Sequence, residues 1–179
     1  MKIVVIGMGY VGIPAAALFA DVDGFQVTGV QRRSARSGWK IDWLNEGRNP
    51  IGGDEPGLEE LLQRVHKKGT FKVVDDYSVV KDADAILIDV QTPTDEDHVP
   101  RYESLKDVSQ TISSLIKKGS LVVIESTVAP GTTEHMVKPI LEKGSGMKAG
   151  KDFFLAFSYE RVMVGRLLRN ITDLPRIVG

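Results

Sequence analysis

The sequence predicts an α/β fold: a doubly wound, mostly parallel sheet with helices on both faces. Short β-branched apolar runs alternate with amphipathic or alanine-rich stretches along the 179 residues, which is the pattern of parallel strands joined by helical crossovers. The first run, residues 2–6, reads Lys-Ile-Val-Val-Ile and is typical of a strand buried on both faces. We find no second domain and no internal repeat, so we expect a single domain over residues 1–179.

The predicted elements follow one another at the spacing of βαβ units. An alanine-rich helix over residues 13–20 separates the first strand from a second one at residues 25–30. Pro139 interrupts a later helical pattern and should kink or shorten that helix. Three glycines between Lys143 and Lys151 predict the most mobile connection. The other expected helices span residues 34–46, 58–67, 105–117 and 131–143, and the other expected strands span residues 71–74, 85–90, 121–124 and 153–156.

Composition excludes several classes of function. A formal net charge of -1 predicts no attraction to nucleic acid or to an anionic membrane. The chain contains no cysteine, which rules out a disulfide framework, a thiolate zinc site and a cysteine nucleophile within it. We find neither a secretory signal pattern nor a run of about 20 apolar residues, so we expect a cytoplasmic chain. The three histidines are scattered and the acidic residues 95–97 resemble a solvated turn, so no metal site is expected.

Residues 7–12, Gly-Met-Gly-Tyr-Val-Gly, have the glycine spacing of a phosphate-binding turn. A strand precedes them, a helix opens within them and a second strand follows, which is the context that distinguishes a dinucleotide site from a turn without a ligand. Gly7 permits the tight turn, Gly9 lets the backbone approach a pyrophosphate, and Gly12 allows close helix–sheet packing. The helix N-terminus supplies free N–H groups to the phosphates. The sequence therefore predicts a Rossmann-type domain that binds a nicotinamide dinucleotide.

The position that usually carries an acidic residue for the ribose 2′-hydroxyl holds Gln31 instead. A glutamine can hydrogen-bond a hydroxyl and does not repel a 2′-phosphate. Arg32, Arg33 and Arg36 follow it, and they can either attract such a phosphate or form a solvated surface. We expect NAD as the cofactor, with NADP possible because the acidic residue is replaced.

Three further segments accompany the glycine turn at residues 7–12. They are residues 91–94 (Gln-Thr-Pro-Thr), 125–132 (Glu-Ser-Thr-Val-Ala-Pro-Gly-Thr) and 160–165 (Glu-Arg-Val-Met-Val-Gly). In this order and spacing, the four segments resemble the UDP-glucose/GDP-mannose dehydrogenase family, and a loop at residues 49–58 resembles it more weakly. These enzymes oxidise the C6 hydroxyl of a nucleotide sugar to a carboxylate in two NAD-dependent steps.

The resemblance implies a set of cofactor contacts. Tyr10 and Val11 would cover the pyrophosphate, and Arg36 would lie near the adenosine ribose. The dinucleotide fingerprint itself places Gln31, followed by Arg32, near the same ribose. Thr92, at the carboxyl end of a strand, would contact the cofactor near its ribose and nicotinamide. From the residues alone, Thr92 before a proline can equally start a turn.

The resemblance also implies catalytic and substrate contacts. Thr127 would order a water or contact substrate and cofactor, and Glu160 would act in acid–base chemistry or position the water of the hydrolytic step. Glu160, Arg161 and Val162 would face the sugar. The structural alternatives are that Thr127 caps a strand end and that Glu160 pairs with Arg161 or Arg166.

The sequence of residues 160–162, Glu-Arg-Val, resembles that of the family branch that oxidises UDP-N-acetylhexosamines, such as UDP-N-acetylmannosamine, to uronates. Tyr159 stands where the family usually has proline, and Val164 where the UDP-glucose branch has a second glutamate. Family members are about twice as long, form homo-oligomers and carry a catalytic cysteine in a later sugar domain, so we expect an N-terminal domain that is inactive alone. A β-hydroxyacid dehydrogenase domain and a non-catalytic nucleotide-binding module are the alternatives.

Overall fold

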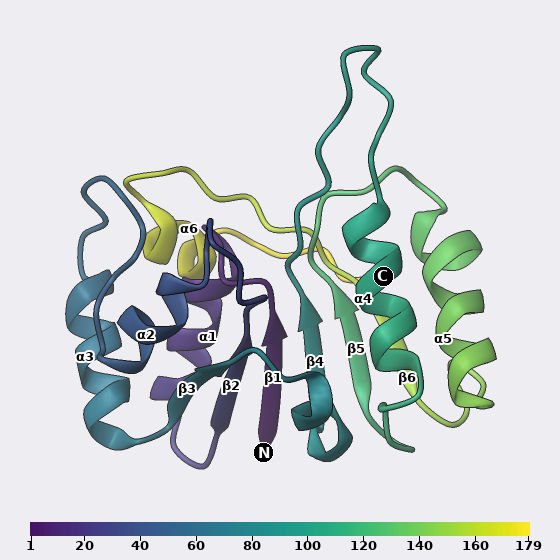
Figure 1. The fold of residues 1–179 in the computed structure, drawn as a ribbon, viewed down its shortest axis with the longest axis horizontal. Coiled ribbons are helices and arrows are strands. Elements are labelled where there is room, and N and C mark those ends of the chain that lie inside the picture. Colours follow the sequence, from purple (N-terminus) through teal and green to yellow (C-terminus); the bar gives the residue numbers. More distant parts are fainter.

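The computed structural model describes residues 1–179 as one six-stranded sheet in the order β3-β2-β1-β4-β5-β6. All five pairs of neighbouring strands are parallel, and helices lie in front of and behind the sheet (Figure 1). The predicted doubly wound α/β fold is confirmed. The strands are β1 (Lys2–Ile6), β2 (Gln26–Val30), β3 (Phe71–Val74), β4 (Ala85–Ile88), β5 (Leu121–Ile124) and β6 (Phe154–Phe157).

Six α-helices connect and cover the strands. They are α1 (Gly12–Asp21), α2 (Trp39–Asn45), α3 (Leu58–Lys68), α4 (Glu103–Ser113), α5 (Lys138–Ser145) and α6 (Leu167–Asp173), with a 3-10 segment at Tyr77–Asp82 and a π-helical segment at Thr133–Val137. None of the helices is long and apolar enough to cross a membrane.

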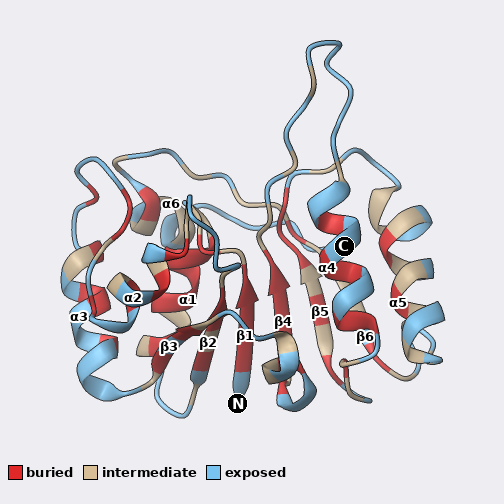
Figure 2. Ribbon diagram, viewed as in Figure 1, coloured by how far each residue is buried: buried red, intermediate tan, exposed pale blue.

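The strands are buried because each side of the sheet has its own hydrophobic core. Successive residues of a strand point to opposite faces, so Ile3 and Val5 join the core under α1, α2, α3 and α6, whereas Val4 and Ile6 join the core under α4 and α5. The central strands β1 and β4 are accordingly buried in Figure 2, whereas the edge strand β6 has only exposed and half-buried residues. This two-sided burial explains why β1 is a continuous apolar run and not an alternating one.

Two predicted helices differ in detail from the structure. The helix expected from residue 34 begins only at Trp39, because Ser34 Oγ and the Ser34 carbonyl accept hydrogen bonds from the Ser37 N–H and hold a local turn. The α-helix expected over residues 131–143 is shortened as predicted. Thr133–Val137 is π-helical, and α5 begins at Lys138, so that Pro139 stands in its first turn, where proline is tolerated.

One helix was not predicted, and it depends on a distant residue. The carboxylate of Glu55, a buried side chain, accepts hydrogen bonds from the N–H groups of Gly165 and Leu167, the latter at 3.2 Å. These contacts fix the start of α6, which is too short to show a helical period in the sequence. The family-like loop around Glu55 therefore anchors the segment that follows residue 160.

Two loops can be compared with their predicted character. In the arm that projects between β4 and α4 (Figure 1), Asp95 Oδ1 accepts hydrogen bonds from the Asp97 and Val99 N–H groups at 3.1 and 2.8 Å, which is the predicted turn. In the glycine-rich connection after α5, the Glu142 carboxylate accepts a hydrogen bond from the Ala149 N–H at 3.1 Å and pairs with the Lys148 ammonium at 2.9 Å. These contacts bind the connection to α5.

Candidate dinucleotide-binding site

The glycine turn lies at the carboxyl end of β1, beside the point where the strand order reverses between β1 and β4. Open α/β sheets bind ligands at this position. Gly7 has φ +106°, and a Cβ there would stand 2.4 Å from the Asp89 carbonyl oxygen. A Cβ on Gly12 would stand 2.0 Å from the Gly7 carbonyl oxygen. These two glycines are required by the fold itself.

Gly9 is different, because a Cβ there would meet no atom within 4 Å. The backbone N–H groups of residues 9–12 donate no hydrogen bond within the protein, and the N-terminus of α1 has no side-chain cap. Unpaired N–H groups at a helix N-terminus, above open space, fit a pyrophosphate. Tyr10 is exposed beside this space, and Val11 is the residue before α1.

The side chain of Gln31 stabilises the glycine turn through hydrogen bonds. Its amide oxygen accepts a hydrogen bond from the Met8 N–H at 3.2 Å, and its amide nitrogen donates to Ser37 Oγ at 3.1 Å and to the Arg32 carbonyl at 3.2 Å. Lys40 Nζ donates to the Met8 carbonyl at 3.2 Å, and burial lowers the pKa of Lys40. Gln31 therefore has a structural role in addition to any contact with a ribose.

The three arginines after β2 are not equivalent. Arg33 pairs with Asp75 at 3.2 Å and with Asp42 at 3.5 Å, so its guanidinium is already engaged. Arg32 and Arg36 are exposed and form no ion pair. Only these two remain available to a cofactor.

Thr92 and Thr127 meet although they are 35 residues apart. Thr92 Oγ1 donates a hydrogen bond to the Thr127 carbonyl at 2.7 Å, and nearby Ser126 Oγ donates to the Val90 carbonyl at 2.7 Å. These bonds join the segments that follow β4 and β5 at the same edge as the glycine turn. Thr127 also lines a groove of about 1050 Å³, whose walls include Phe157 and Tyr159.

Glu160 lies in a buried ionic cluster with Arg176. Arg176 Nη1 stands 2.8 Å from Glu160 Oε1, while Nη2 contacts Glu125 and donates to the Ser158 carbonyl at 2.8 Å. The Glu160 side chain is only 4% exposed. Burial raises the pKa of Glu160, with Arg176 opposing and Glu125 reinforcing that shift. The structural alternative named the wrong partner, since Glu160 pairs with Arg176 and not with the side chains of Arg161 or Arg166.

Arg161 and Val162 point to other parts of the protein. The Arg161 guanidinium donates to the Pro175 carbonyl, and its backbone N–H donates to Glu160 Oε2 at 3.3 Å. Val162 is half-buried and packs against the core under α1. In this structure both residues hold the loop that carries Glu160.

No functional role was predicted for Asp89, Glu125 or Arg176. Both Asp89 carboxylate oxygens, Glu125 Oε2 and Glu160 Oε1 are buried without a hydrogen-bond donor. Burial raises the pKa of Asp89 well above its ordinary value, the charge of Glu125 adds to this shift, and the charge of Arg176 opposes it. An available signal was an acidic residue within or directly after an apolar, doubly buried strand, where an ionised group requires a partner.

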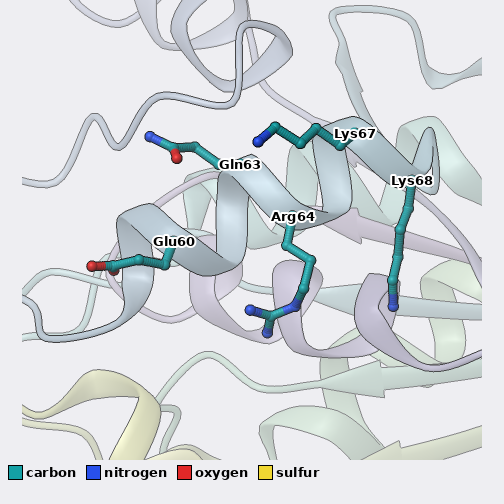
Figure 3. Close-up of a pocket in the computed structure, with 5 residues that line it drawn as sticks. All are labelled: Glu60, Gln63, Arg64, Lys67 and Lys68. Atoms are coloured by element: carbon teal, nitrogen blue, oxygen red, sulfur yellow. The ribbon is translucent and has the colours of Figure 1, made fainter.

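A second hollow lies away from this edge, on the outer side of α3, and all five residues that line it belong to that helix (Figure 3). Two of them, Arg64 and Lys68, bind Asp21 at 2.9 and 2.7 Å and hold its pKa far below the usual range. The depression is a charged surface whose cations are partly paired, remote from the glycine turn. No group of three or more potential ligands could hold a metal ion.

A parallel sheet of this order, with an open glycine turn at its reversal point, defines a Rossmann-type dinucleotide-binding domain. The chain belongs to the UDP-glucose/GDP-mannose dehydrogenase family, and the model of that family's NAD-binding domain matches residues 1–179. The family predicted from the four segments is thereby confirmed.

Relatives cover the whole chain. A UDP-N-acetyl-D-mannosamine dehydrogenase of Pyrococcus horikoshii is 37% identical over 100% of this chain and 41% of its own length. A UDP-N-acetyl-D-glucosamine 6-dehydrogenase of Pseudomonas aeruginosa is 32% identical over 100% of this chain and 40% of its length. The crystal structure of NDP-N-acetyl-D-galactosaminuronic acid dehydrogenase from Methanosarcina mazei Go1 has a TM-score of 0.96 at 53% identity, covering 99% of this chain and 38% of that one. The chain thus spans about two fifths of the length of these relatives.

Proposed function

We propose that this chain is the NAD-binding domain of a longer, homo-oligomeric enzyme that oxidises the C6 hydroxyl of a UDP-N-acetylhexosamine to a carboxylate. The observation that carries the cofactor assignment is the open space over Gly9 with its unpaired N–H groups. The substrate class is supported by three relatives whose names each contain an N-acetylhexosamine or its uronate. The residues at positions 160–162, Glu-Arg-Val, support the same branch.

The residues at the sheet edge divide into those that hold the cofactor and those that act on substrate. The N–H groups of residues 9–12 bind the pyrophosphate, and Tyr10 and Val11 cover it. Thr92 orients the cofactor near its nicotinamide ribose. These residues would hold NAD so that, when bound, it would supply the hydride acceptor for oxidation of the sugar carbon.

Thr127 and Glu160 serve the chemical steps. Thr127 lies at the end of β5, where its side chain orders a water or contacts substrate and cofactor. Glu160 accepts a proton or positions the water of the hydrolytic step, and a carboxyl whose pKa is raised by burial is suited to that exchange near neutral pH. Arg161 and Val162 place the loop of Glu160 beside the sugar.

The chain by itself should not oxidise any UDP-sugar. Formation of a covalent intermediate requires an activated nucleophile, and none of the 179 residues is cysteine. The measurement is the absorbance of reduced cofactor after addition of UDP-N-acetylmannosamine, with calorimetry confirming that the same sample binds NAD. Sustained reduction would show that another residue performs the covalent step.

NAD should bind with weak discrimination against NADP, within about tenfold or 1.4 kcal/mol. The acidic residue that normally repels a 2′-phosphate is replaced by Gln31, and Arg32 and Arg36 are free to attract one. Gln31→Asp should raise the preference for NAD, mainly by weakening NADP binding. Side-by-side calorimetric titrations of both cofactors measure this.

Arg33→Gln is the matched control for that titration, because Arg33 is already held by Asp75 and Asp42. It should leave the NAD-to-NADP ratio unchanged, whereas Arg32→Gln should weaken NADP specifically. A wild-type protein that excludes NADP by a thousandfold would show that our interpretation of Gln31 is wrong.

A further inference from the structure

Three carboxyl groups and one guanidinium gather at the carboxyl edge of the sheet. Asp89 follows β4, Glu125 follows β5, Glu160 follows β6, and Arg176 reaches them from the C-terminal segment. The side chains of Glu125 and Glu160 are 2% and 4% exposed. These are the charged groups that act on Asp89. The four residues form what we call the edge cluster.

The hydrogen bonds of Arg176 leave one carboxyl group without a donor. Its Nη2 serves Glu125, its Nη1 faces Glu160, and its Nε donates to Ser158 Oγ at 3.1 Å. Neither oxygen of Asp89 receives a hydrogen bond, nor does Glu125 Oε2. Glu160 Oε1 also receives none, but it has an ion-pair partner in Arg176 Nη1 at 2.8 Å. With all three acids ionised, the edge cluster would hold three negative charges against one positive charge. A buried, unpaired carboxylate is costly and takes up a proton instead.

Asp89 is the acid whose surroundings favour a bound proton. It directly follows Ile88, which pairs with Ile124, the residue before Glu125, so the two carboxyl groups come from neighbouring strand ends. Burial raises the pKa of Asp89, the charges of Glu125 and Glu160 add to this shift, and the charge of Arg176 opposes it. A hydrogen bond between two carboxyl groups requires a proton on one of them. The unpaired Oε2 of Glu125 is available to accept it.

We propose that Asp89 is a positioning residue that stays protonated and donates a hydrogen bond to Glu125, so that Arg176 remains bound to Glu160. The proposal rests on the acid–base role proposed for Glu160. If Asp89 lost its proton, it would repel Glu125 and compete for the guanidinium, drawing Arg176 away from Glu160. The proton stays between Asp89 and Glu125 and is not transferred to substrate.

Infrared spectroscopy of the 179-residue chain at neutral pH tests the protonation without cofactor or substrate. Wild type should show a carboxylic-acid carbonyl band that Asp89→Asn removes. Asp23→Asn, at an exposed residue that makes no side-chain hydrogen bond, is the matched control and should keep the band. A spectrum that Asp89→Asn does not change would overturn the proposal.

Thermal unfolding provides a second, independent readout. An acid whose pKa is raised by folding binds its proton more tightly in the native state, so stability falls as pH rises from its ordinary value of 3.8 toward the native value. Asp89→Asn cannot ionise, so its melting temperature should fall less than that of wild type over this interval. Parallel pH profiles for the two proteins would count against a proton on Asp89.

Turnover of the enzyme that contains this chain tests the positioning role. Asp89→Asn should keep kcat within about threefold, because an amide N–H replaces the O–H as donor. Asp89→Ala should lower kcat by about tenfold, equal to about 1.4 kcal/mol, with an unchanged KM for NAD and a shifted pH dependence of kcat. Equal losses in both variants, or no loss in either, would contradict the role of the donor.

Glu160→Gln separates this proposal from the proposed function. Slow turnover of Glu160→Gln together with normal turnover of Asp89→Ala would show that only the role of Asp89 is wrong. Normal turnover of Glu160→Gln would remove the positioning role together with the acid–base role, and the infrared result would still decide whether Asp89 carries the proton.

Discussion

Replacing Gly9 with valine should abolish binding of the nicotinamide dinucleotide and leave the fold intact. A Cβ at Gly9 meets no protein atom within 4 Å, so the branched side chain would occupy the space of the pyrophosphate and shield the N–H groups that would bind it. We expect NAD affinity to fall by at least about a hundredfold, or about 2.7 kcal/mol. Calorimetric titration with NAD measures the affinity, and thermal unfolding followed by circular dichroism measures the stability.

Two other glycines provide controls: one variant should keep NAD binding, and the other should destabilise the fold. Gly52 is far from the glycine turn in sequence, and a Cβ there also has no neighbour within 4 Å. The Gly52→Val variant should therefore bind NAD like wild type. Gly12→Val should instead destabilise the protein by about 3 kcal/mol or more, because its Cβ would stand 2.0 Å from the Gly7 carbonyl oxygen. Unchanged NAD affinity in Gly9→Val would show that the glycine turn is not the phosphate site.

In the longer enzyme proposed for this chain, Glu160→Gln should slow turnover by about 10²–10⁴-fold with nearly normal binding of NAD. Glutamine preserves the shape of the side chain but cannot accept a proton. Because burial raises the pKa of Glu160, wild-type activity should decline as pH falls through that raised value and protonates the base. The variant should lack this acidic decline, and steady-state kinetics across pH measure both effects.

Glu46→Gln is the control for Glu160→Gln, since Glu46 is exposed and pairs with Arg48 on the surface at 3.1 Å. Exposed ion pairs contribute little to stability, so this variant should have wild-type kinetics. Wild-type turnover in Glu160→Gln would return Glu160 to a purely structural role as a partner of Arg176. An acidic decline that persists in Glu160→Gln would assign that titration to another group.

Much of the candidate site could be predicted from sequence because its signals are local. The glycine turn needs a strand, three spaced glycines and a helix within about 20 residues, and all of them are present between Lys2 and Asp21. Thr92 and Thr127 were predicted as site residues, and the structure brings them together because both follow neighbouring parallel strands. Helix boundaries were less accurate, because side-chain turns such as that of Ser34 compete with a helix.

The sequence by itself determined the α/β class, the order of the six strands and the first five helices along the chain, and the glycine turn, because short stretches of sequence carry each of these signals. The tertiary structure decided which distant groups share one buried environment. Arg176 pairs with Glu125 from 51 residues away, and Glu55 fixes the start of α6 from 112 residues away. Asp89 gains its raised pKa only when folding brings Glu125 beside it and excludes water. Periodicity along a chain carries no information about such pairs, so they emerged only from the folded structure.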